Sequence, residues 1–238
     1  DGVLYVLGEG GITRLHDYNQ DGEADYYERF SKMELQLGGP GSENQNLERD
    51  AAGNFYVCGR RGIVRISPDG EKMEVISVGS RNPLGLGVRP DGLTLSDSSE
   101  GSPSNGTCTI YESNHLENEG SVSKLKRVLY LPRAVDNSPG SRIFMDDPSF
   151  GPLGESIIGT SYGSGRLYQI LRDPNHGTPQ AAMMLLPMEI SSGAARIAVN
   201  PKDKQVYVVG FDGWGDVAVT EGSFNRLRYT GKPCLKPA

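Results

Sequence analysis

The chain has 238 residues, of which 24 are basic and 30 are acidic, so its formal net charge is −6. This acidic balance argues against nucleic acid or an anionic membrane as a partner, and no apolar run is long enough to insert into a membrane. The length fits one large all-β domain or two small ones, and the 32 glycines are typical of a chain with many tight turns.

An acidic loop is the first motif in the chain. The stretch DYNQDGEADYYE covers residues 17–28 and alternates Asp, Asn and Asp before a glycine, with a glutamate at its twelfth position. This is the spacing of a calcium loop, in which oxygen atoms at alternate positions surround the ion and the glycine permits a sharp turn. The expected ligands are Asp17, Asn19, Asp21, Glu23 through its carbonyl, Asp25 and Glu28.

The segments on either side of this loop do not have a helical pattern. GVLYVLGEGGITRLH precedes it and ADYYERF follows it, and both favour strands. We therefore expect a structural calcium site between two strands rather than a calcium sensor, with an ordinary acidic surface turn as the alternative. Such a loop works best where calcium is millimolar, which favours a secreted or periplasmic protein.

Similar units recur along the whole chain. Each combines a polar turn, a β-rich run, a glycine-rich loop and often a second run, and the units recur roughly every 35–60 residues, which is typical of propeller blades. The unit after the calcium loop can be divided into four strands, NLERDA, NFYVCG, GIVRIS and KMEVISVG. The first unit lacks its first strand and the last lacks an obvious fourth strand.

The repeat predicts an all-β fold, a β-propeller of four-stranded blades with about five repeats. We assign residues 1–238 to one such domain, and a β-sandwich is the alternative. The chain begins directly with strand sequence and shows no signal peptide, so we expect a mature product or a piece of a larger chain.

Alternation of strand direction sorts the loops onto two faces of the predicted propeller. The calcium loop lies on one face, whereas the longer glycine-rich loops lie on the other, where a binding site is expected. Several arginines are predicted at the rim of that second face, namely Arg60, Arg61, Arg81, Arg133, Arg142 and Arg196. These arginines suit a ligand rich in carboxylates or an acidic sugar, or else pair with nearby acidic residues.

Two other signals are weaker. The stretch GTSYG (residues 159–163) fits a nucleophile elbow, but a predicted strand follows it instead of the required helix, which argues against a serine hydrolase. The three cysteines, Cys58, Cys108 and Cys234, are far apart and could form one disulfide whose pairing stays open.

The stretch GSRNPLGLGVRPDGLTLSDSSEG (residues 79–101) resembles the soluble glucose/sorbosone dehydrogenases, which are calcium-dependent six-bladed propellers that bind pyrroloquinoline quinone (PQQ). The match rests on Arg81-Asn82-Pro83, the RPDG turn and the later loop near Gly101. GAARIAVNPKDKQVYVVGFDGWG and FNRLRYTGKP are similar to propellers of planctomycete-type bacteria known as membrane-bound dehydrogenases, often joined to cytochrome domains. The resemblance implies that Arg81 and Asn82 contact the quinone and that the Gly101 loop lies beside its calcium.

The chain departs from that family at the general base. The dehydrogenases use a histidine before the second blade, whereas the matching positions here are Ser42, Glu43 and Asn44. Abstraction of a hydride from a sugar alcohol needs a base of suitable pKa, so the catalytic base is not identifiable. Arg196 and Trp214 are further candidates for contacts to the quinone, Trp214 by stacking or else as a packing residue.

Two functions follow from the resemblance. The first is a PQQ-dependent sugar or alcohol dehydrogenase that passes electrons to a cytochrome. The second is a non-catalytic, calcium-stabilised propeller that binds a carbohydrate or a partner protein. A lactonase-type propeller is a third possibility, to whose central metal site Asn82 and Asp97 could contribute.

Overall fold

The computed structural model describes residues 3–8, 10–32, 35, 46–59, 62–78, 83–98, 107–114, 123–173, 177–212 and 221–231. This part of the chain is almost entirely β-structure, with one short 3-10 helix, η2 (Pro148–Leu153). Within the described ranges, no helix is long and apolar enough to cross a membrane.

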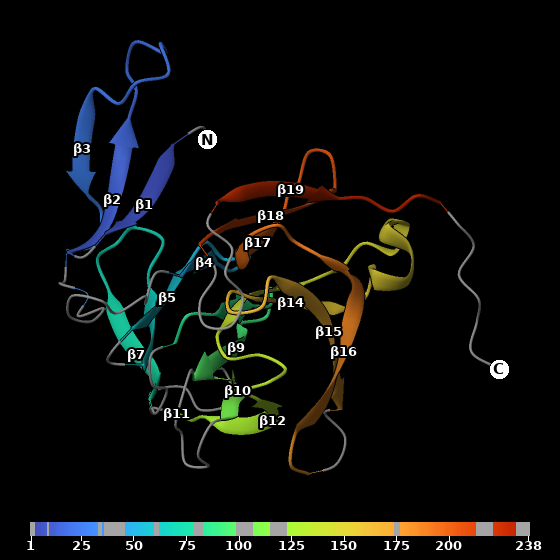
Figure 1. Ribbon diagram of the computed structural model, residues 1–238. Helices are drawn as coiled ribbons and strands as arrows, with labels where there is room; N and C mark the ends of the chain where they lie inside the picture. The colour runs from blue at the N-terminus through green and yellow to red at the C-terminus, as the bar shows by residue number, and fades with distance from the viewer. Residues whose placement is uncertain are drawn as a thin grey trace.

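The strands form five consecutive sheets (Figure 1). The first contains β1 (Leu4–Gly8), β2 (Gly11–His16) and β3 (Tyr26–Arg29). The second contains β4 (Leu47–Arg49), β5 (Phe55–Gly59), β6 (Gly62–Ile66), β7 (Met73–Val78) and β11 (Ser123–Lys124). The third contains β8 (Leu86–Val88), β9 (Leu93–Ser98), β10 (Thr107–Asn114) and β12 (Lys126–Pro132). The fourth contains β13 (Pro139–Phe144), β14 (Ile157–Ser161), β15 (Arg166–Asp173) and β16 (Gln180–Glu189), and the fifth contains β17 (Gly193–Val199), β18 (Val206–Phe211) and β19 (Ser223–Leu227).

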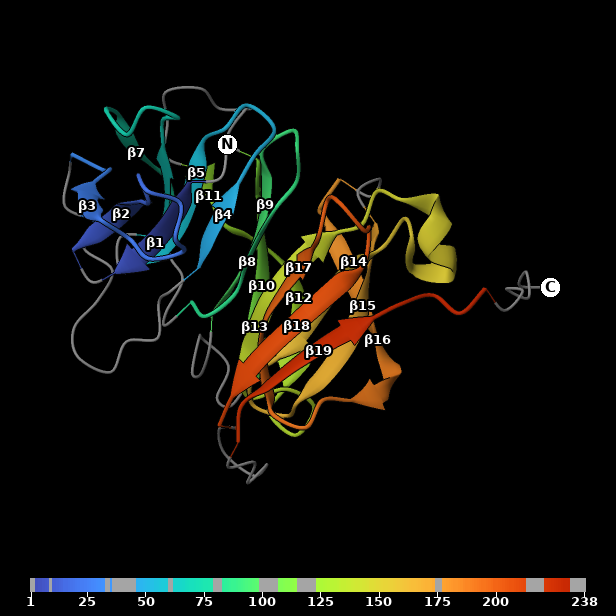
Figure 2. The ribbon, with the colours of Figure 1, turned by 90° about the horizontal axis from the view of Figure 1, so that it is seen from above.

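The sheets are the blades of a β-propeller, as the sequence predicts. Strands β4, β8, β13 and β17 each begin a blade, and each contacts the next one around the centre of the molecule. Seen from above, the blades follow one another from β1–β3 at one end to β13–β19 at the other (Figure 2). The innermost strands therefore surround the centre, and the later strands of each blade lie farther out.

The second blade confirms the predicted division into four strands. Its strands β4 to β7 pair in sequence order and match the runs NLERDA, NFYVCG, GIVRIS and KMEVISVG. The first and fifth blades have three strands each within the described residues, as expected. Strand β11 was not predicted from the sequence. It follows β10 of the third blade in the chain, but it pairs in parallel with β7 and so extends the second blade.

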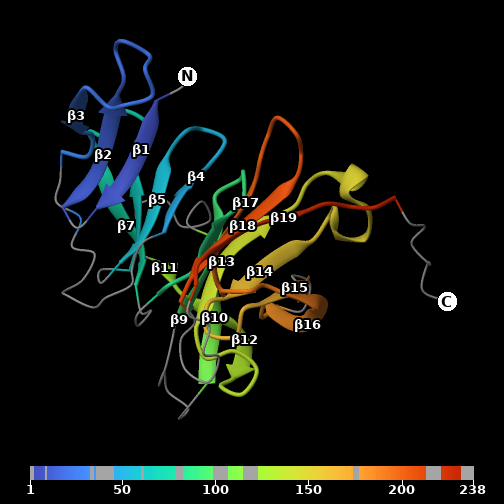
Figure 3. The same cartoon turned by 45° about the horizontal axis from the view of Figure 1, so that its top comes forward.

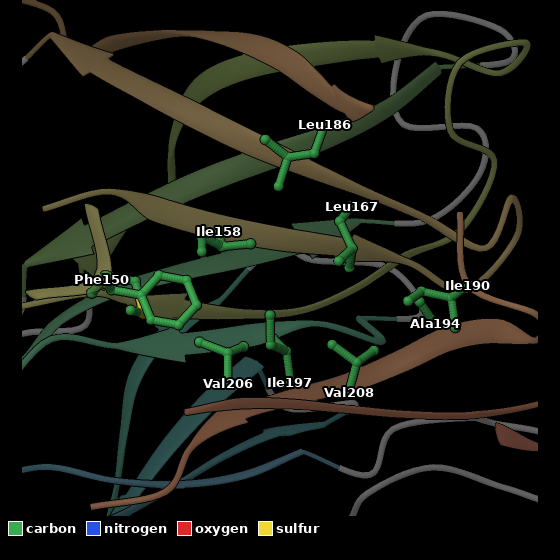
Figure 4. Close-up of a cluster of buried hydrophobic side chains, with 10 residues drawn as sticks. Phe150, Ile158, Leu167, Leu186, Ile190, Ala194, Ile197, Val206 and Val208 are labelled. Carbon is green, nitrogen blue, oxygen red and sulfur yellow. The ribbon is translucent and has the colours of Figure 1, made fainter. Parts of the chain in front are cut away.

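Apolar side chains pack between successive blades. The cluster between the fourth and fifth blades contains Ile158 and Leu167 on one side and Ile197, Val206 and Val208 on the other. Figure 4 shows these side chains pointing toward one another between the two sheets. Similar clusters join each of the other neighbouring pairs, so burial of apolar area between sheets holds the arrangement together.

The outward faces of the first and fifth blades are different. Leu4 on β1 is 66% exposed, and Val6 on the same strand is also exposed. Phe224 on β19 is 72% exposed and stacks on Tyr207 of β18. Figure 3 shows the first blade (β1–β3) and the fifth blade (β17–β19) as two separate sheets. These two faces are thus more apolar than the usual solvent-facing side of a sheet.

Candidate functional site

One end of the propeller gathers the loops that were predicted to carry function. Strand direction alternates within each blade, so the β5–β6, β9–β10 and β14–β15 connections share an end with the segments that lead into β4, β8, β13 and β17. We call this the entry end, because the innermost strands enter their blades there. The opposite end, which holds the β2–β3 loop with the calcium motif, is called the exit end.

A buried ion pair joins the third and fourth blades near the centre. Arg142 on β13 donates through Nη2 to Asp97 Oδ2 on β9 over 3.2 Å, and both side chains are fully buried. Asp97 also accepts the backbone N–H groups of Leu84 and Gly85, each over 2.9 Å. Burial raises the pKa of Asp97 to about 6, against the opposing effect of Arg142 and the two N–H donors.

This arrangement corrects one sequence prediction. Arg142 was predicted at the rim of the second face, but it is buried on the innermost strand β13, and its partner Asp97 lies within β9. Both oxygens of Asp97 accept bonds from protein groups, so in this structure the carboxylate connects the entry segment of the third blade to the fourth blade.

Leu84 is the meeting point of four blades at the entry end. Its carbonyl accepts a hydrogen bond from Asn46 Nδ2 and another, of 3.3 Å, from Arg196 Nη1. Its side chain packs with Tyr162 and Ala195. The segment that follows the predicted Arg81-Asn82 pair in the sequence therefore reaches the centre of the propeller.

Arg196 and Glu48 are an arginine and an acid on two innermost strands. Arg196 on β17 donates through Nη1 to the carbonyls of Leu84 and, over 2.9 Å, of Ala195. Burial raises the pKa of the half-buried Glu48 on β4 to about 8, and the nearby Arg196 guanidinium opposes this rise. Glu48 can therefore hold a proton at neutral pH.

Asp136 locks two entry-end segments of the fourth blade together. It is 1% exposed, and its Oδ1 accepts bonds from Ser138 N over 3.0 Å and from Ser161 Oγ over 2.7 Å. Ser164 donates its hydroxyl to Ser161 Oγ over 2.7 Å, and Tyr162 N donates to the Ser138 carbonyl over 2.9 Å. The segment before β13 and the β14–β15 turn thus form one hydrogen-bonded unit.

The second oxygen of Asp136 is unusual. Oδ2 is buried and has no hydrogen-bond partner within the described residues. Burial raises the pKa of Asp136 to about 7, while Ser161, Ser138 and the charge of Arg142 favour the ionised form. A buried acceptor without a partner lowers the stability of the fold. A proton or a hydrogen-bond donor at this oxygen would therefore be stabilising.

Of the predicted quinone-contacting residues, only Arg196 lies within the described part of the chain, where it donates to the Leu84 carbonyl. Arg81, Asn82, Gly101 and Trp214 lie outside the described residues, as do Arg60, Arg61 and residues 42–44. Their roles stay predictions.

The calcium motif forms the connection between β2 and β3, so the prediction of a loop between strands is confirmed. Asp17 accepts backbone N–H bonds from Gln20 and Gly22 over 2.6 and 3.0 Å, and Asp21 accepts one from Glu23 over 2.8 Å. Gly22 has φ 91°, which favours glycine. The donor set is rich in oxygen, but no three acidic, histidine or cysteine side chains in the described ranges are grouped to hold a metal ion.

Glu28, the twelfth residue of the motif, bonds to two side chains of β2. Its Oε2 lies 2.7 Å from His16 Nε2 and 3.2 Å from Arg14 Nη1. The bond to His16 is the largest cause of the lowered pKa of Glu28. His16 is therefore a locally bonded side chain, and coordination of calcium by Glu28 Oε2 would compete with its bonds to His16 and Arg14.

The weaker sequence signals have simple structural roles. Ser161 of the GTSYG stretch is followed by a turn and then by β15, not by a helix, and its hydroxyl bonds to Asp136 rather than to a histidine. Cys58 is a free, buried thiol whose pKa is raised by burial, so it behaves as a small core residue.

Asn46, Glu48 and Asp136 were not predicted from the sequence. A usable signal was present, because a short polar segment precedes or begins the innermost strands: Asn46 before β4, Asp136-Asn137-Ser138 before β13 and Ser192 before β17. These residues are buried despite being polar, which is expected at the narrow centre where strands from several blades converge.

Comparison with known proteins supports the fold assignment. No family model and no curated protein matches the chain. Among solved structures, a glucose dehydrogenase-type oxidoreductase from Thermus thermophilus matches with a TM-score of 0.59 and 17% identity, over 94% of this chain and 78% of that one. Another glucose dehydrogenase matches with a TM-score of 0.60 and 14% identity, over 93% of this chain and 76% of that one.

A gluconolactonase from Xanthomonas campestris is also similar, with a TM-score of 0.52 and 16% identity, over 87% of this chain and 65% of that one. Identities this low establish the fold and not the activity. The chain therefore has the β-propeller fold found in glucose dehydrogenases and gluconolactonases.

Proposed function

We propose that this chain is a sugar-handling propeller of the quinoprotein dehydrogenase type, which oxidises a sugar or alcohol and passes the electrons to an acceptor such as a cytochrome. The observation that supports this most is the group of charged and polar side chains on the innermost strands at the entry end, centred on Leu84 and Arg196. Active sites are expected where perturbed carboxyl pKa values and cations converge.

PQQ, when bound, would accept the electrons of the substrate. Arg196 is the described cation best placed to attract its carboxylates, and Arg81, Asn82, Gly101 and Trp214 are proposed to complete the contacts. The Asp97–Arg142 pair would hold the surrounding strands in position without touching the ligand. The bonds from Arg196 Nη1 to the carbonyl oxygens of Leu84 and Ala195 fix the guanidinium at this position.

The proton acceptor stays unassigned. Asp136 has a pKa of about 7 and Glu48 of about 8, values that suit proton exchange near neutral pH. However, Asp136 is buried within its own hydrogen bonds, and residues 42–44 contain no histidine. This favours the second candidate, a non-catalytic propeller that binds a carbohydrate or a partner protein at the entry end.

Calcium is proposed as a second, structural component. The loop over residues 17–28 has oxygen-bearing side chains at the expected positions and a glycine with positive φ at its sixth. The loop lies at the exit end, so the ion would stiffen the β2–β3 hairpin rather than contact the substrate. Secretion or a periplasmic location, where calcium is plentiful, is proposed on the same ground.

The test is an absorbance titration of the protein with PQQ, with and without calcium, on the wild type and on Arg81→Ala and Arg196→Ala. We expect saturable, calcium-dependent binding that either variant weakens, followed by oxidation of a sugar with an artificial electron acceptor. The matched control is Arg226→Ala, which removes an exposed arginine from β19.

Absence of binding at tens of micromolar PQQ, which corresponds to about −6 kcal/mol or weaker, would overturn the quinoprotein proposal. A screen of unlabelled sugars by calorimetry would then test the binding propeller. Sugar binding without PQQ binding supports the second candidate, and binding of neither overturns both.

A further inference from the structure

A groove at the exit end lies between the third and fourth blades, away from the entry-end loops. Its volume is about 590 Å³, within the range of sites that take small ligands. Arg89 from the β8–β9 turn forms part of its lining, and Phe144, Ile157 and Arg172 come from strands of the fourth blade. No predicted site residue lies among the residues that line it.

Strand register places two carboxylates side by side in this groove. Phe144 on β13 pairs with Ile157 on β14, and the pairing continues beyond the strands, since Met145 N donates to the Ser156 carbonyl and Asp147 N to that of Gly154, each over 2.8 Å. Asp146 is therefore directly opposite Glu155.

The same register sets the face on which the two acids lie. Residues two apart in a strand share a face. Asp146 and Glu155 therefore lie on the same side of the sheet as Phe144 and Ile157, which is the side that faces the third blade. Residues opposite each other in such a ladder have their Cβ atoms about 5 Å apart. The groove thus combines an apolar pair with an acidic pair at its outer margin.

Among the described residues, neither acid forms an ion pair, although Arg89 and Arg172 line the same groove. Asp146 and Glu155 are exposed and have no hydrogen bond or ion pair with other described residues. The two arginines of the groove are already paired, Arg89 with Asp91 over 2.7 Å and Arg172 with Glu112 over 2.7 Å. Like charges directly opposite each other on a sheet are unfavourable, so this pair would gain from a cation.

We propose that this groove binds an organic cation with an apolar body, with the ammonium or guanidinium group between Asp146 and Glu155 and the apolar part against Phe144 and Ile157. The chemistry of the lining excludes a bare metal ion as the best fit, because an ion would leave the apolar pair uncovered. A free amine and a lysine or arginine side chain in a peptide share this chemistry. The site does not depend on the function proposed for the entry end.

The test is calorimetric titration with 2-phenylethylamine, with its uncharged analogue 2-phenylethanol, with a lysine-phenylalanine dipeptide amide capped at its N-terminus, and with calcium chloride. We expect the cationic probes to bind at least ten-fold more tightly than the alcohol. Tighter binding of the dipeptide assigns the site to peptides, and tighter binding of the amine assigns it to free amines.

The matched variants are Asp146→Asn with Glu155→Gln, compared with Asp203→Asn, which removes one exposed charge from a turn of the fifth blade. We expect the double variant to weaken cation binding at least ten-fold and the control to leave it unchanged. Both acids are exposed, so the double variant should fold, which thermal unfolding checks. Equal binding of amine and alcohol, or unchanged binding by the double variant, would overturn the proposal, as would calcium binding that displaces the amine.

Discussion

Arg142 and Asp97 form an ion pair that is inaccessible to solvent, and they come from innermost and second strands of adjacent blades. Asp97 has further partners besides Arg142, because it also accepts hydrogen bonds from the backbone N–H groups of Leu84 and Gly85. One carboxylate thus ties the entry segment of the third blade both to its own β9 and to the fourth blade. The centre of this propeller is held by charge as well as by apolar packing.

Replacement of Asp97 by asparagine should strongly destabilise the fold. The variant leaves Arg142 buried without a counter-charge, and breaking one side of a buried ion pair typically costs about 3–5 kcal/mol. The measurement is urea unfolding of the wild type and of Asp97→Asn.

The double variant Asp97→Asn with Arg142→Met separates two contributions of Arg142 to the free energy of unfolding, that of its charge and that of its packing. Methionine fills much of the same volume without a charge, so we expect the double variant to be more stable than Asp97→Asn alone. A double variant that is less stable than Asp97→Asn would show that Arg142 is needed for contacts other than its bond to Asp97.

Asp97 also illustrates what the sequence could and could not predict about the fold. The alternation of Leu93 and Leu95 indicates a strand, and an acid at the next inward position looks like the start of a loop. Its burial depends on Arg142, which is 45 residues away in the chain. Local sequence patterns therefore predicted the strands of the second blade correctly. The extent of β9 and the burial of Arg142 depend instead on contacts between blades, which local patterns do not show.

Gly85 should not tolerate even a methyl group. A Cβ atom at this position would lie 1.8 Å from the Gly140 carbonyl oxygen and 2.6 Å from Asp97 Oδ2, both of which are parts of the packed centre. We expect Gly85→Ala to lower the free energy of unfolding by more than about 4 kcal/mol or to prevent folding. Gly10→Ala is the control, because no atom lies within 4 Å of its added Cβ, and thermal unfolding compares the two.

The raised pKa of Asp136 predicts a loss of stability as pH rises. The carboxyl has a pKa of about 7 in the folded chain and about 3.9 when unfolded. Between these values the folded state binds more protons, so the contribution of Asp136 to stability falls from pH 4 to pH 7, by at most about 4 kcal/mol. Asp136→Asn does not titrate and should remove this part of the pH dependence.

Thermal unfolding at pH 5 and pH 8 checks this expectation on both proteins. The unfolding temperature of the wild type should fall more between the two pH values than that of Asp136→Asn. An equal fall in both would mean that Asp136 Oδ2 has a partner in solution that keeps its pKa near the ordinary range.

The candidate site was less predictable than the fold. Arg196 was predicted at the rim with five other arginines, and no sequence pattern indicated that its guanidinium bonds to the Leu84 carbonyl. Asn46 and Asp136 were not recognised, because each precedes an innermost strand and resembles an ordinary turn residue. Asn46 is buried against Leu84 of the next blade, and Asp136 against Ser161, 25 residues later in the chain, and no single stretch of sequence reveals either contact.

Calcium should stabilise the protein through the β2–β3 loop if the proposed site exists. A ligand that binds only the folded chain adds about 2.7 kcal/mol at a hundred-fold excess over its Kd. We therefore expect millimolar calcium to raise the unfolding temperature by several degrees. Asp17→Asn with Asp21→Asn should abolish the increase, because both remove a charged oxygen ligand.

Two controls distinguish a specific ion site from a general effect of charge. Asp203→Asn removes a similar exposed carboxylate elsewhere, so it should keep the full response to calcium. Magnesium at the same concentration should have a smaller effect, because it demands shorter, octahedral coordination that a twelve-residue loop of this type does not favour. An equal response of the loop variant and the wild type would show that calcium acts elsewhere, and the loop would then be an acidic turn held by its own N–H bonds to Asp17 and Asp21.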